Sequence, residues 1–304
     1  MSRKILAATI FILMLAALTL SGCSGNNTTP TPIQPDIPHD ANQVTIQGIT
    51  LQRIDAPPPV WEVPERPTPD TIAEDVTTTT LLQLSPLYVG ELVAVMHTTM
   101  GDIGMRFFPT EAPIAVENFL THAYNGFYDG VLFHRVIPNF MIQTGCPEGT
   151  GMGGESIWGG QFGQEFSTEL RHFRGALAMA QSAAPNSIGS QFYVVQNYEV
   201  AAQSRADFIQ FLEMQDEVFQ AFEDGSEILV RDVFPAAALE YFLENGGTPH
   251  LDWHFNPNAH TVFGHVVWGM DVVDNIANTE TADTRPVQDI TITGFSFFTV
   301  TGGV

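Results

Sequence analysis

The chain has 304 residues, 44% of them hydrophobic, so it is long enough to bury a substantial core. Its 34 acidic residues against 11 basic ones give a formal net charge of −23 at pH 7. Nucleic acid is therefore not an expected partner, because phosphate contacts need clustered lysine and arginine side chains. The chain has only two cysteines, which excludes a fold built on a disulfide framework.

The N-terminal segment has the features of a signal peptide. Arg3 and Lys4 precede a continuous apolar run over Ile5–Leu18, which is short for a transmembrane helix and is followed by small residues. The segment ends in the sequence LSGC at Cys23, which resembles the lipobox of bacterial lipoproteins, where the cysteine is lipidated and becomes the first residue. We therefore expect residues 1–22 to be removed and Cys23 to carry a lipid such as palmitate on the extracytoplasmic face of the bacterial cell membrane. An ordinary secretory signal with a chance cysteine is the alternative.

Residues 23–88 are interpreted as a tether followed by an irregular segment. The stretch TTPTPIQPDIP favours extended, polyproline-type conformations and lacks the residues for a core. Apolar residues alternate over Val44–Ile54 and are compatible with a strand, but the proline-rich stretch APPPVWEVPERPTPD interrupts the chain again. One folded domain is expected to follow, over 89–304.

From Glu91 the pattern becomes that of a β-rich domain. The sequence ELVAVMHTTMGDIGMRFFP predicts a hairpin that turns at Gly101–Asp102. The sequence PIAVENFLTHAY predicts a helix that begins at Pro113 and ends before Gly126, because its apolar residues recur at helical spacing. Further elements are expected, namely short strands within 131–195, over 261–267 and over 290–298, and a helix over 270–277. Many short strands with two helices favour a barrel or sandwich over a parallel sheet.

A segment at about 199–250 separates these strands and is interpreted as a helical insertion. Ser204 and Asp207 form a candidate capping box. One helical stripe carries four apolar side chains, those of Phe208, Leu212, Phe219 and Phe222. A second helix is expected from Pro235 to the sequence NGG. An insertion packed on the rim of the domain is favoured over a separate binding module.

Four stretches carry a resemblance to a known family. The sequences FPTEAPIAVENFLTHA, VLFHRVIPNFMIQTG, FRGALAMAQSAAPNSIGSQFYVV and HTVFGHVVWGMDVVD resemble, in this order, the blocks of cyclophilins, which are peptidyl-prolyl cis-trans isomerases. The resemblance covers roughly 91–298, interrupted by the insertion. It implies a mainly β fold, an eight-stranded antiparallel β-barrel capped by two helices.

The resemblance also implies an active site and no cofactor or metal. Arg135 matches the catalytic arginine of the family. The remaining matches are the walls of the proline pocket, its polar rim and the position next to the substrate backbone, namely Phe140, Met141, Tyr193 and Leu251, then Gln143, Gln191 and His260, then Ala180. A barrel rim is expected to place these residues beside a cleft.

The residue types suit the isomerisation of an Xaa-Pro bond. The barrier, roughly 18–20 kcal/mol, comes from amide resonance, so neither a nucleophile nor a proton transfer is required. When the prolyl nitrogen becomes pyramidal it gains a lone pair, which a guanidinium donor stabilises more in the twisted state than in the planar one. Arg135 is the predicted donor, Gln143 is expected to orient it, and the apolar residues would grip the pyrrolidine ring.

The chain departs from the family pattern at three places. Tyr193 stands where the family commonly has Phe, which adds a hydroxyl that needs a partner. Gln181 and Ser182 replace the short polar step after Ala180, which puts the substrate preference in doubt. His250 replaces the tryptophan that many members carry before the Leu-Asp pair, in a lengthened loop.

Three other motifs have a second interpretation. The sequence GTGMGG resembles a glycine-rich phosphate loop, but no helix is predicted after it, so a loop is favoured. A cluster of borderline metal ligands has a spacing that matches no established pattern, and no metal is predicted there: His250, Asp252, His254 and His260. Cys146 is interpreted as a buried, inert thiol.

Together these observations predict a lipid-anchored, monomeric prolyl isomerase that assists the folding of proline-containing polypeptides outside the cytoplasm. Uncatalysed Xaa-Pro isomerisation is slow enough to limit folding. A binding module or holdase that grips proline-containing segments without turnover is the alternative, with the insertion as its interface. Retention of Arg135 with Phe140, Met141 and Gln143 favours the enzyme.

Overall fold

The computed structural model describes residues 41–57, 81–184, 186–222, 226–252 and 259–303. The predicted signal peptide and Cys23 lie outside the described residues. Among the described helices, none combines the length and the apolar character that crossing a membrane would need. The described chain forms two compact units, one of Ala201–Glu240 and one of the remaining residues.

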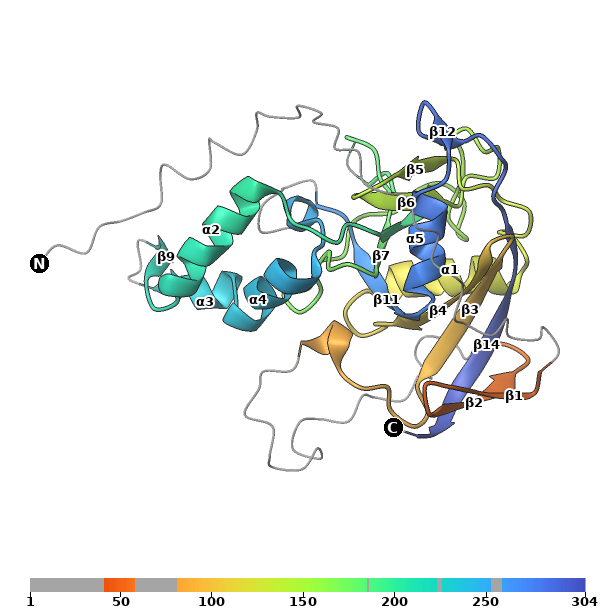
Figure 1. Ribbon diagram of the computed structural model, residues 1–304, viewed down its shortest axis with the longest axis horizontal. Helices are drawn as coiled ribbons and strands as arrows, with labels where there is room; N and C mark the ends of the chain where they lie inside the picture. The colour runs from red at the N-terminus through yellow and green to blue at the C-terminus, as the bar shows by residue number, and fades with distance from the viewer. Residues whose placement is uncertain (1–40, 58–80, 185, 223–225, 253–258, 304) are drawn as a thin grey trace, which may run out of the picture. The chain divides into compact units, whose positions relative to one another are not determined.

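The larger unit is built on one antiparallel sheet of ten strands (Figure 1). In spatial order the strands are β1 (Gln43–Ile46), β2 (Ile49–Ile54), β14 (Ile292–Gly302), β3 (Leu92–Thr98), β4 (Gly101–Phe107), β11 (Val262–Trp268), β7 (Ala176–Met179), β8 (Phe192–Val195), β6 (Met141–Thr144) and β5 (Arg135–Ile137). Eight of them, from β14 to β5, fall within the predicted domain. The mainly β, antiparallel prediction is confirmed.

The last strand approaches the beginning of β14 without a full ladder. Leu132, just before β5, forms an isolated antiparallel bridge with Thr291, just before β14. The backbone N–H of Phe133 donates to the carbonyl of Ile290 at 2.9 Å. These bonds join the two ends of the eight-stranded sheet, as expected for a barrel.

The two helices expected beside the sheet are present with the predicted bounds. They are α1 (Pro113–Tyr124) and α5 (Met270–Ala277). Pro113 occupies the first turn of α1, where its missing N–H costs nothing. The free N–H groups of Ile114 and Ala115 donate to the carboxylate of Glu165, at 3.0 and 2.8 Å. This distant cap is a tertiary contact that local sequence patterns do not reveal.

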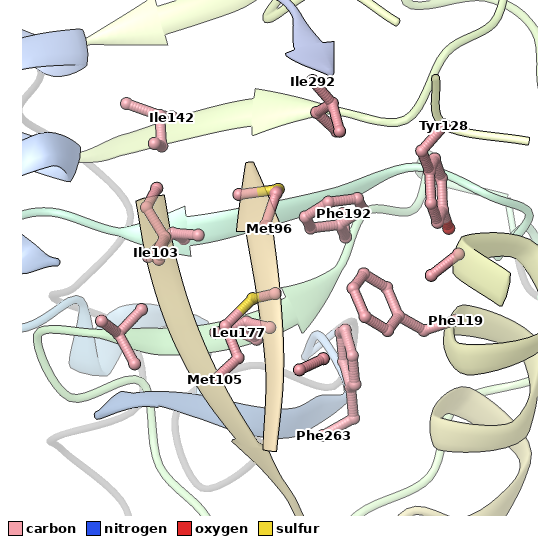
Figure 2. Close-up of a cluster of buried hydrophobic side chains, with 14 of the residues drawn as sticks. Met96, Ile103, Met105, Phe119, Tyr128, Ile142, Leu177, Phe192, Phe263 and Ile292 are labelled. Carbon is pink, nitrogen blue, oxygen red and sulfur yellow. The ribbon is translucent and has the colours of Figure 1, made fainter. Parts of the chain in front are cut away.

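Alternation along the strands separates an inner apolar face from an outer one. In Figure 2, Phe119 projects from its helix toward Phe192 and Phe263, and strand side chains such as Ile103 and Met105 fill the same cluster. The ring centroids of Phe119 and Phe192 are 4.9 Å apart in a T-shaped arrangement, which aromatic pairs favour. This cluster is the core of the larger unit.

The β3–β4 hairpin is confirmed, but its turn differs from the prediction. Thr99 and Met100 form the turn, and Gly101 already begins β4 with a φ of 125°, a value that favours glycine. The 44–54 stretch, for which a strand was considered, forms the two strands of the β1–β2 hairpin. Its second strand pairs with β14.

The smaller unit contains helices and one short hairpin. Its elements are α2 (Ala202–Glu213), β9 (Val218–Ala221), β10 (Glu227–Leu229), α3 (Val230–Val233) and the first part of α4 (Ala236–Asn245). The helix expected after Pro235 is confirmed as α4. The rings of Phe211 and Phe234 stack with centroids 4.6 Å apart and form the apolar centre of the smaller unit.

Two details of the insertion were predicted wrongly. Ser204 does not cap a helix, because α2 begins at Ala202 and places Ser204 inside its first turn. Phe219 and Phe222 do not continue the helical stripe, since α2 ends at Glu213. Phe219 lies in β9 instead. The helical spacing of the apolar residues continued by coincidence past the end of α2 into the β9–β10 hairpin.

Candidate active site

Four neighbouring strands align the central predicted residues in one row. Arg135 on β5 is the register partner of Gln143 on β6, and Gln143 is the partner of Tyr193 on β8. Tyr193 is in turn paired with Ala178 on β7. Directly opposed residues of adjacent strands project to the same face, so the arginine, the amide and the phenol ring are neighbours.

This row lies on the outer face of the sheet. The alternate residues Val136, Ile142 and Val194 belong to the inner core. The prediction had placed the site at a barrel rim, whereas the two-residue period of these strands puts it on the flank of the sheet. The polar side chains there are compatible with folding because they do not enter the core.

The four pocket walls expected from the resemblance and Ala180, the position next to the substrate backbone, belong to one apolar cluster, separate from the core. Met141 and Tyr193 are buried members of this cluster. Phe140, Ala180 and Leu251 are partly buried and pack against it. Leu251 comes from a 3-10 helix, η4 (Pro249–Leu251), far from the strands in the sequence. The structure therefore brings together all five apolar residues.

Arg135 lies at the edge of this cluster. Its Nη1 donates to Oε1 of Gln143 at 3.1 Å and lies 3.9 Å from the Met141 sulfur. Its guanidinium carbon is 5.8 Å from the centre of the Phe140 ring, a cation–π distance. Burial lowers the pKa of Arg135, which still carries its charge because an arginine does not lose its proton in a protein.

The described residues offer Arg135 no ion-pair partner. Its only polar side-chain partner among them is Gln143, which is neutral. An arginine has five N–H donors, so most of them are left for a ligand. A positive charge next to an apolar cluster, without an acid to neutralise it, suits a site for a developing lone pair.

Two glutamines continue the polar contact away from the arginine. Nε2 of Gln143 donates to Oε1 of Gln191 at 3.0 Å. Nε2 of Gln191 donates to the carbonyls of Gly151 and Gly153 at 3.0 and 2.8 Å. The glycine-rich loop, interpreted from the sequence as a loop without a phosphate, therefore provides carbonyl acceptors that hold the Gln191 amide. This role of the loop was not predicted.

His260 and His250 lie beside the same apolar cluster, next to Tyr193 and Phe140 respectively. Nδ1 of His260 lies 3.0 Å from the carbonyl of Met179, so this nitrogen carries the proton and Nε2 is the acceptor. Burial lowers the pKa of His260 to about 4, so the ring is neutral at pH 7. Burial also lowers the pKa of His250, whose ring stacks on Phe140 with centroids 5.9 Å apart.

Ala180 and Gln181 follow β7 and lie beside the cluster. The backbone N–H of Ala180 donates to the carbonyl of Gln191 at 2.9 Å. Nε2 of Gln181 donates to the carbonyl of Ala259 at 2.8 Å, so this departure from the family pattern ties the segment to the residues before His260. The contact stabilises the edge next to Ala180.

The hydroxyl of Tyr193 has a buried protein partner. It lies 2.9 Å from Nε2 of His172, whose Nδ1 is 2.7 Å from Oδ1 of Asp252. Sequence reasoning identified the need for a partner but not His172. The signal was the tyrosine itself, since a buried phenol needs a hydrogen-bond partner.

The described residues contain no group of three or more histidine, cysteine, aspartate or glutamate side chains that could hold a metal. Of the four-residue cluster considered above, His254 lies outside the described residues. Asp252 is bonded to His172 instead. Cys146 is a buried free thiol whose sulfur accepts the N–H of Gly151 at 3.2 Å.

The structure thus combines an antiparallel β sheet with an arginine beside an outer apolar cluster. Residues 93–229 and 232–296 match the family described as "Cyclophilin type peptidyl-prolyl cis-trans isomerase/CLD". The chain therefore belongs to the cyclophilin-type peptidyl-prolyl cis-trans isomerases. Members of this family interconvert the cis and trans forms of Xaa-Pro bonds, and the chain is an enzyme of this class.

Two relatives share 44% identity with the chain. One, from Staphylococcus haemolyticus (strain JCSC1435), aligns over 203 residues, which are 66% of this chain and 89% of the relative. The other, from Staphylococcus aureus (strain USA300), aligns over 204 residues, 67% and 90% of the two chains. Each is called "Putative peptidyl-prolyl cis-trans isomerase". A crystal structure of a cyclophilin-type isomerase from Cryptosporidium parvum is 24% identical, with a TM-score of 0.48, and covers 71% of this chain and 99% of its own.

Proposed function

We propose that Arg135 is the catalytic donor of this isomerase and that the outer apolar cluster holds the proline ring. The observation that carries the proposal is the arginine itself, which lies beside Phe140 and Met141 and has a neutral partner in Gln143. Its charge and most of its donors are therefore available to a ligand. Neither an acid nor a nucleophile is needed for the reaction.

The chemistry follows from the geometry. A pyrrolidine ring packed against Met141 and Tyr193 loses water contact and is held in place, while the preceding carbonyl rotates. In the twisted state the prolyl nitrogen carries a lone pair, to which a guanidinium N–H donates. This bond is weaker in the planar ground states, so it lowers the barrier. Gln143, itself held by Gln191, keeps the guanidinium in position.

Replacement of the arginine tests the proposal. We expect Arg135→Ala to lower kcat/KM for an Xaa-Pro peptide by roughly 100-fold or more, since one preorganised donor contributes about 10²–10³ in other enzymes. Arg135→Lys keeps the charge but loses the planar donor geometry, and should recover only part of the activity. Circular dichroism provides the folding control. An Arg135→Ala variant that is folded and fully active would refute the role.

We further propose that the enzyme acts as a monomer outside the cytoplasm, anchored through a lipid on Cys23, and accelerates the folding of exported proline-containing proteins. The apolar leader and the LSGC sequence support this location. A Cys23→Ser variant should move from the membrane fraction to the soluble fraction or remain unprocessed. An unchanged, membrane-bound and processed variant would contradict the anchor.

A further inference from the structure

A buried chain of polar groups lies against the outer apolar cluster. His172 is the centre of this chain, with Tyr193 at 2.9 Å from its Nε2 and Asp252 at 2.7 Å from its Nδ1. The exposed fractions of His172, Asp252 and Tyr193 are 1%, 2% and 4%. None of the three reacts with substrate in the mechanism above, and two of them were not expected at the site. Such a buried network calls for a function.

We infer that His172 is a positioning residue of the isomerase, and that the chain Tyr193–His172–Asp252 holds two walls of the proline pocket at a fixed separation. This inference rests on the proposed site. One wall is Tyr193 itself. The other is Leu251, which immediately precedes Asp252.

The direction of each hydrogen bond follows from the groups present. Oδ1 of Asp252 accepts the backbone N–H of His172 at 2.7 Å and also faces Nδ1 of the same residue, so Nδ1 carries a proton. A neutral imidazole that carries its proton on Nδ1 has Nε2 as an acceptor, to which the phenol can donate. Burial raises the pKa of Tyr193, which keeps this phenol protonated. The chain therefore has one consistent pattern of donors and acceptors.

His172 is also bonded to the segment that carries Leu251. Its carbonyl accepts the backbone N–H of Thr248 at 2.8 Å, at the start of the turn that contains η4. One residue thus contacts β8 through its side chain and the 248–252 segment through its backbone and Asp252. Breaking the side-chain bond would release the tyrosine from this segment.

Hydrogen bonds add direction to the apolar packing around these three residues. A small pocket beside them is lined in part by His172, Asp252 and His260. Among the described residues, Oδ2 of Asp252 is buried and has no hydrogen-bond partner. Apolar contacts restrict a side chain through close packing but lack direction. The bond between Tyr193 and His172 therefore also fixes the phenol oxygen relative to the 248–252 segment.

The molecule contains a matched control for this chain. His97 on β3 has its Nδ1 2.7 Å from Asp102 and its Nε2 2.8 Å from the hydroxyl of Ser296, and its exposed fraction is also 1%. The chemistry is the same: a carboxylate, a histidine and a hydroxyl. None of these three residues is part of the proposed site. His97 therefore separates a loss of stability from a loss of positioning.

The experiment compares His172→Asn and His97→Asn in the full-length enzyme. In both variants the amide reaches the carboxylate but not the hydroxyl. We expect His172→Asn to raise KM for an Ala-Pro-containing peptide about tenfold with kcat changed less than twofold, because the ring is held in ground and transition states alike. His97→Asn should lower the thermal midpoint but leave both constants unchanged. An equal rise of KM in the two variants, or no rise in His172→Asn, would overturn the inference.

The tyrosine provides the second readout. Adding Tyr193→Phe to His172→Asn should recover most of the lost KM, because the hydroxyl that lacks a partner is removed while the ring remains. If KM did not recover, the proposed role of the Tyr193–His172 hydrogen bond would be refuted. Should His172→Asn fail to fold, Tyr193→Phe alone tests the same bond: a KM raised about threefold supports it, and an unchanged KM refutes it.

Peptide dissociation constants measured by NMR titration distinguish this inference from the proposed function. A wild-type enzyme that binds the peptide without turnover would disprove catalysis by Arg135. The order of affinities would still test the Tyr193–His172–Asp252 hydrogen bonds, since positioning acts on binding. The proteins compared are the wild type, His172→Asn, His97→Asn and the double variant with Tyr193→Phe. Equal affinities would overturn the inference independently of any rate.

Discussion

Two arginines on the outer face of the sheet each lie near a phenylalanine ring but differ in their hydrogen-bond partners. Arg106 on β4 has its guanidinium carbon 5.6 Å from the ring centre of Phe108, and Arg135 on β5 lies 5.8 Å from that of Phe140. Arg106 also bonds to Glu91, with both Nε and Nη2 at 2.7 Å from Oε1. Arg135 meets the neutral Gln143 in the equivalent role. One carboxylate separates a structural arginine from a catalytic candidate.

The comparison shows why proximity to an aromatic ring does not identify a functional arginine. Arg106 is 2% exposed, and the backbone carbonyl of Ser85 takes a further donor. A paired, buried guanidinium has its charge neutralised and its donors occupied. Arg135 is partly buried and has spare donors, so its charge can act on a ligand. The predictions below change one feature of this contrast at a time.

The largest effect is expected from Glu91→Gln, which leaves Arg106 buried without its counter-ion. Removing one partner of a buried ion pair costs roughly 3–5 kcal/mol. We expect the free energy of unfolding, measured in urea, to fall by about this amount, with kcat/KM of the folded protein unchanged. Asp289→Asn is the matched control, since it breaks an exposed pair with Arg285 and should cost less than about 1 kcal/mol. Equal losses of unfolding free energy in the two variants would show that the buried Glu91–Arg106 pair contributes no more than an exposed pair.

A second change makes Arg135 resemble Arg106. Gln143→Glu introduces a carboxylate where the amide accepts at 3.1 Å. A charge-assisted bond would hold and neutralise the guanidinium, so kcat/KM should fall on the order of tenfold to 100-fold. The variant also loses the donor to Gln191, a loss that it shares with the control Gln143→Met. Gln143→Met removes the acceptor without adding charge and should cost less. If Gln143→Glu kept full activity, an unpaired charge on Arg135 would not be the basis of catalysis.

The third prediction uses a histidine next to each arginine. Burial, followed by the charge of Arg106, lowers the pKa of His265 to about 3. In the unfolded chain the His265 imidazole therefore binds a proton below about pH 6.5, whereas in the native state it does so only near pH 3. The free energy of unfolding should therefore fall as the pH is lowered from 6.5 toward 3, by up to about 1.4 kcal/mol per pH unit from His265.

The urea midpoint between pH 7 and pH 4 provides the measurement. His265→Gln should reduce the slope, because the titrating group is lost. The pKa of about 4 for His260 also predicts that kcat/KM does not titrate through this residue above pH 5. A wild-type midpoint that does not change over this range would show that His265 titrates normally in the fold.

The smallest effect is expected at Gln191, two contacts away from the arginine. Gln191→Ala removes the acceptor that fixes Gln143 and leaves Arg135 with its direct partner. A net hydrogen bond contributes about 1 kcal/mol, so we expect kcat/KM to fall roughly three- to fivefold. A larger loss than in Gln143→Met would mean that Gln191 acts on the substrate itself.

Local patterns predicted the regular elements well and the long-range contacts poorly. The helix over 113–124 agrees with the structure because its apolar spacing and its proline are local signals. The false capping box at Ser204 shows the limit of such signals, since two suitable residue types occur inside a helix that starts earlier. The site residues were named through resemblance, and their contacts required coordinates.

By itself the sequence determined the β3–β4 hairpin, the two flanking helices and the order of the blocks, because apolar periodicity and turn residues act over a few positions. The resemblance carried by these blocks named Arg135, Phe140 and Met141 as site residues. Only the tertiary structure decided that Glu91 neutralises Arg106 and not Arg135, and that His172 bonds to Tyr193. The physical reason is that hydrogen bonds and ion pairs depend on distances between residues far apart in the chain. Those distances are set by packing of the whole sheet.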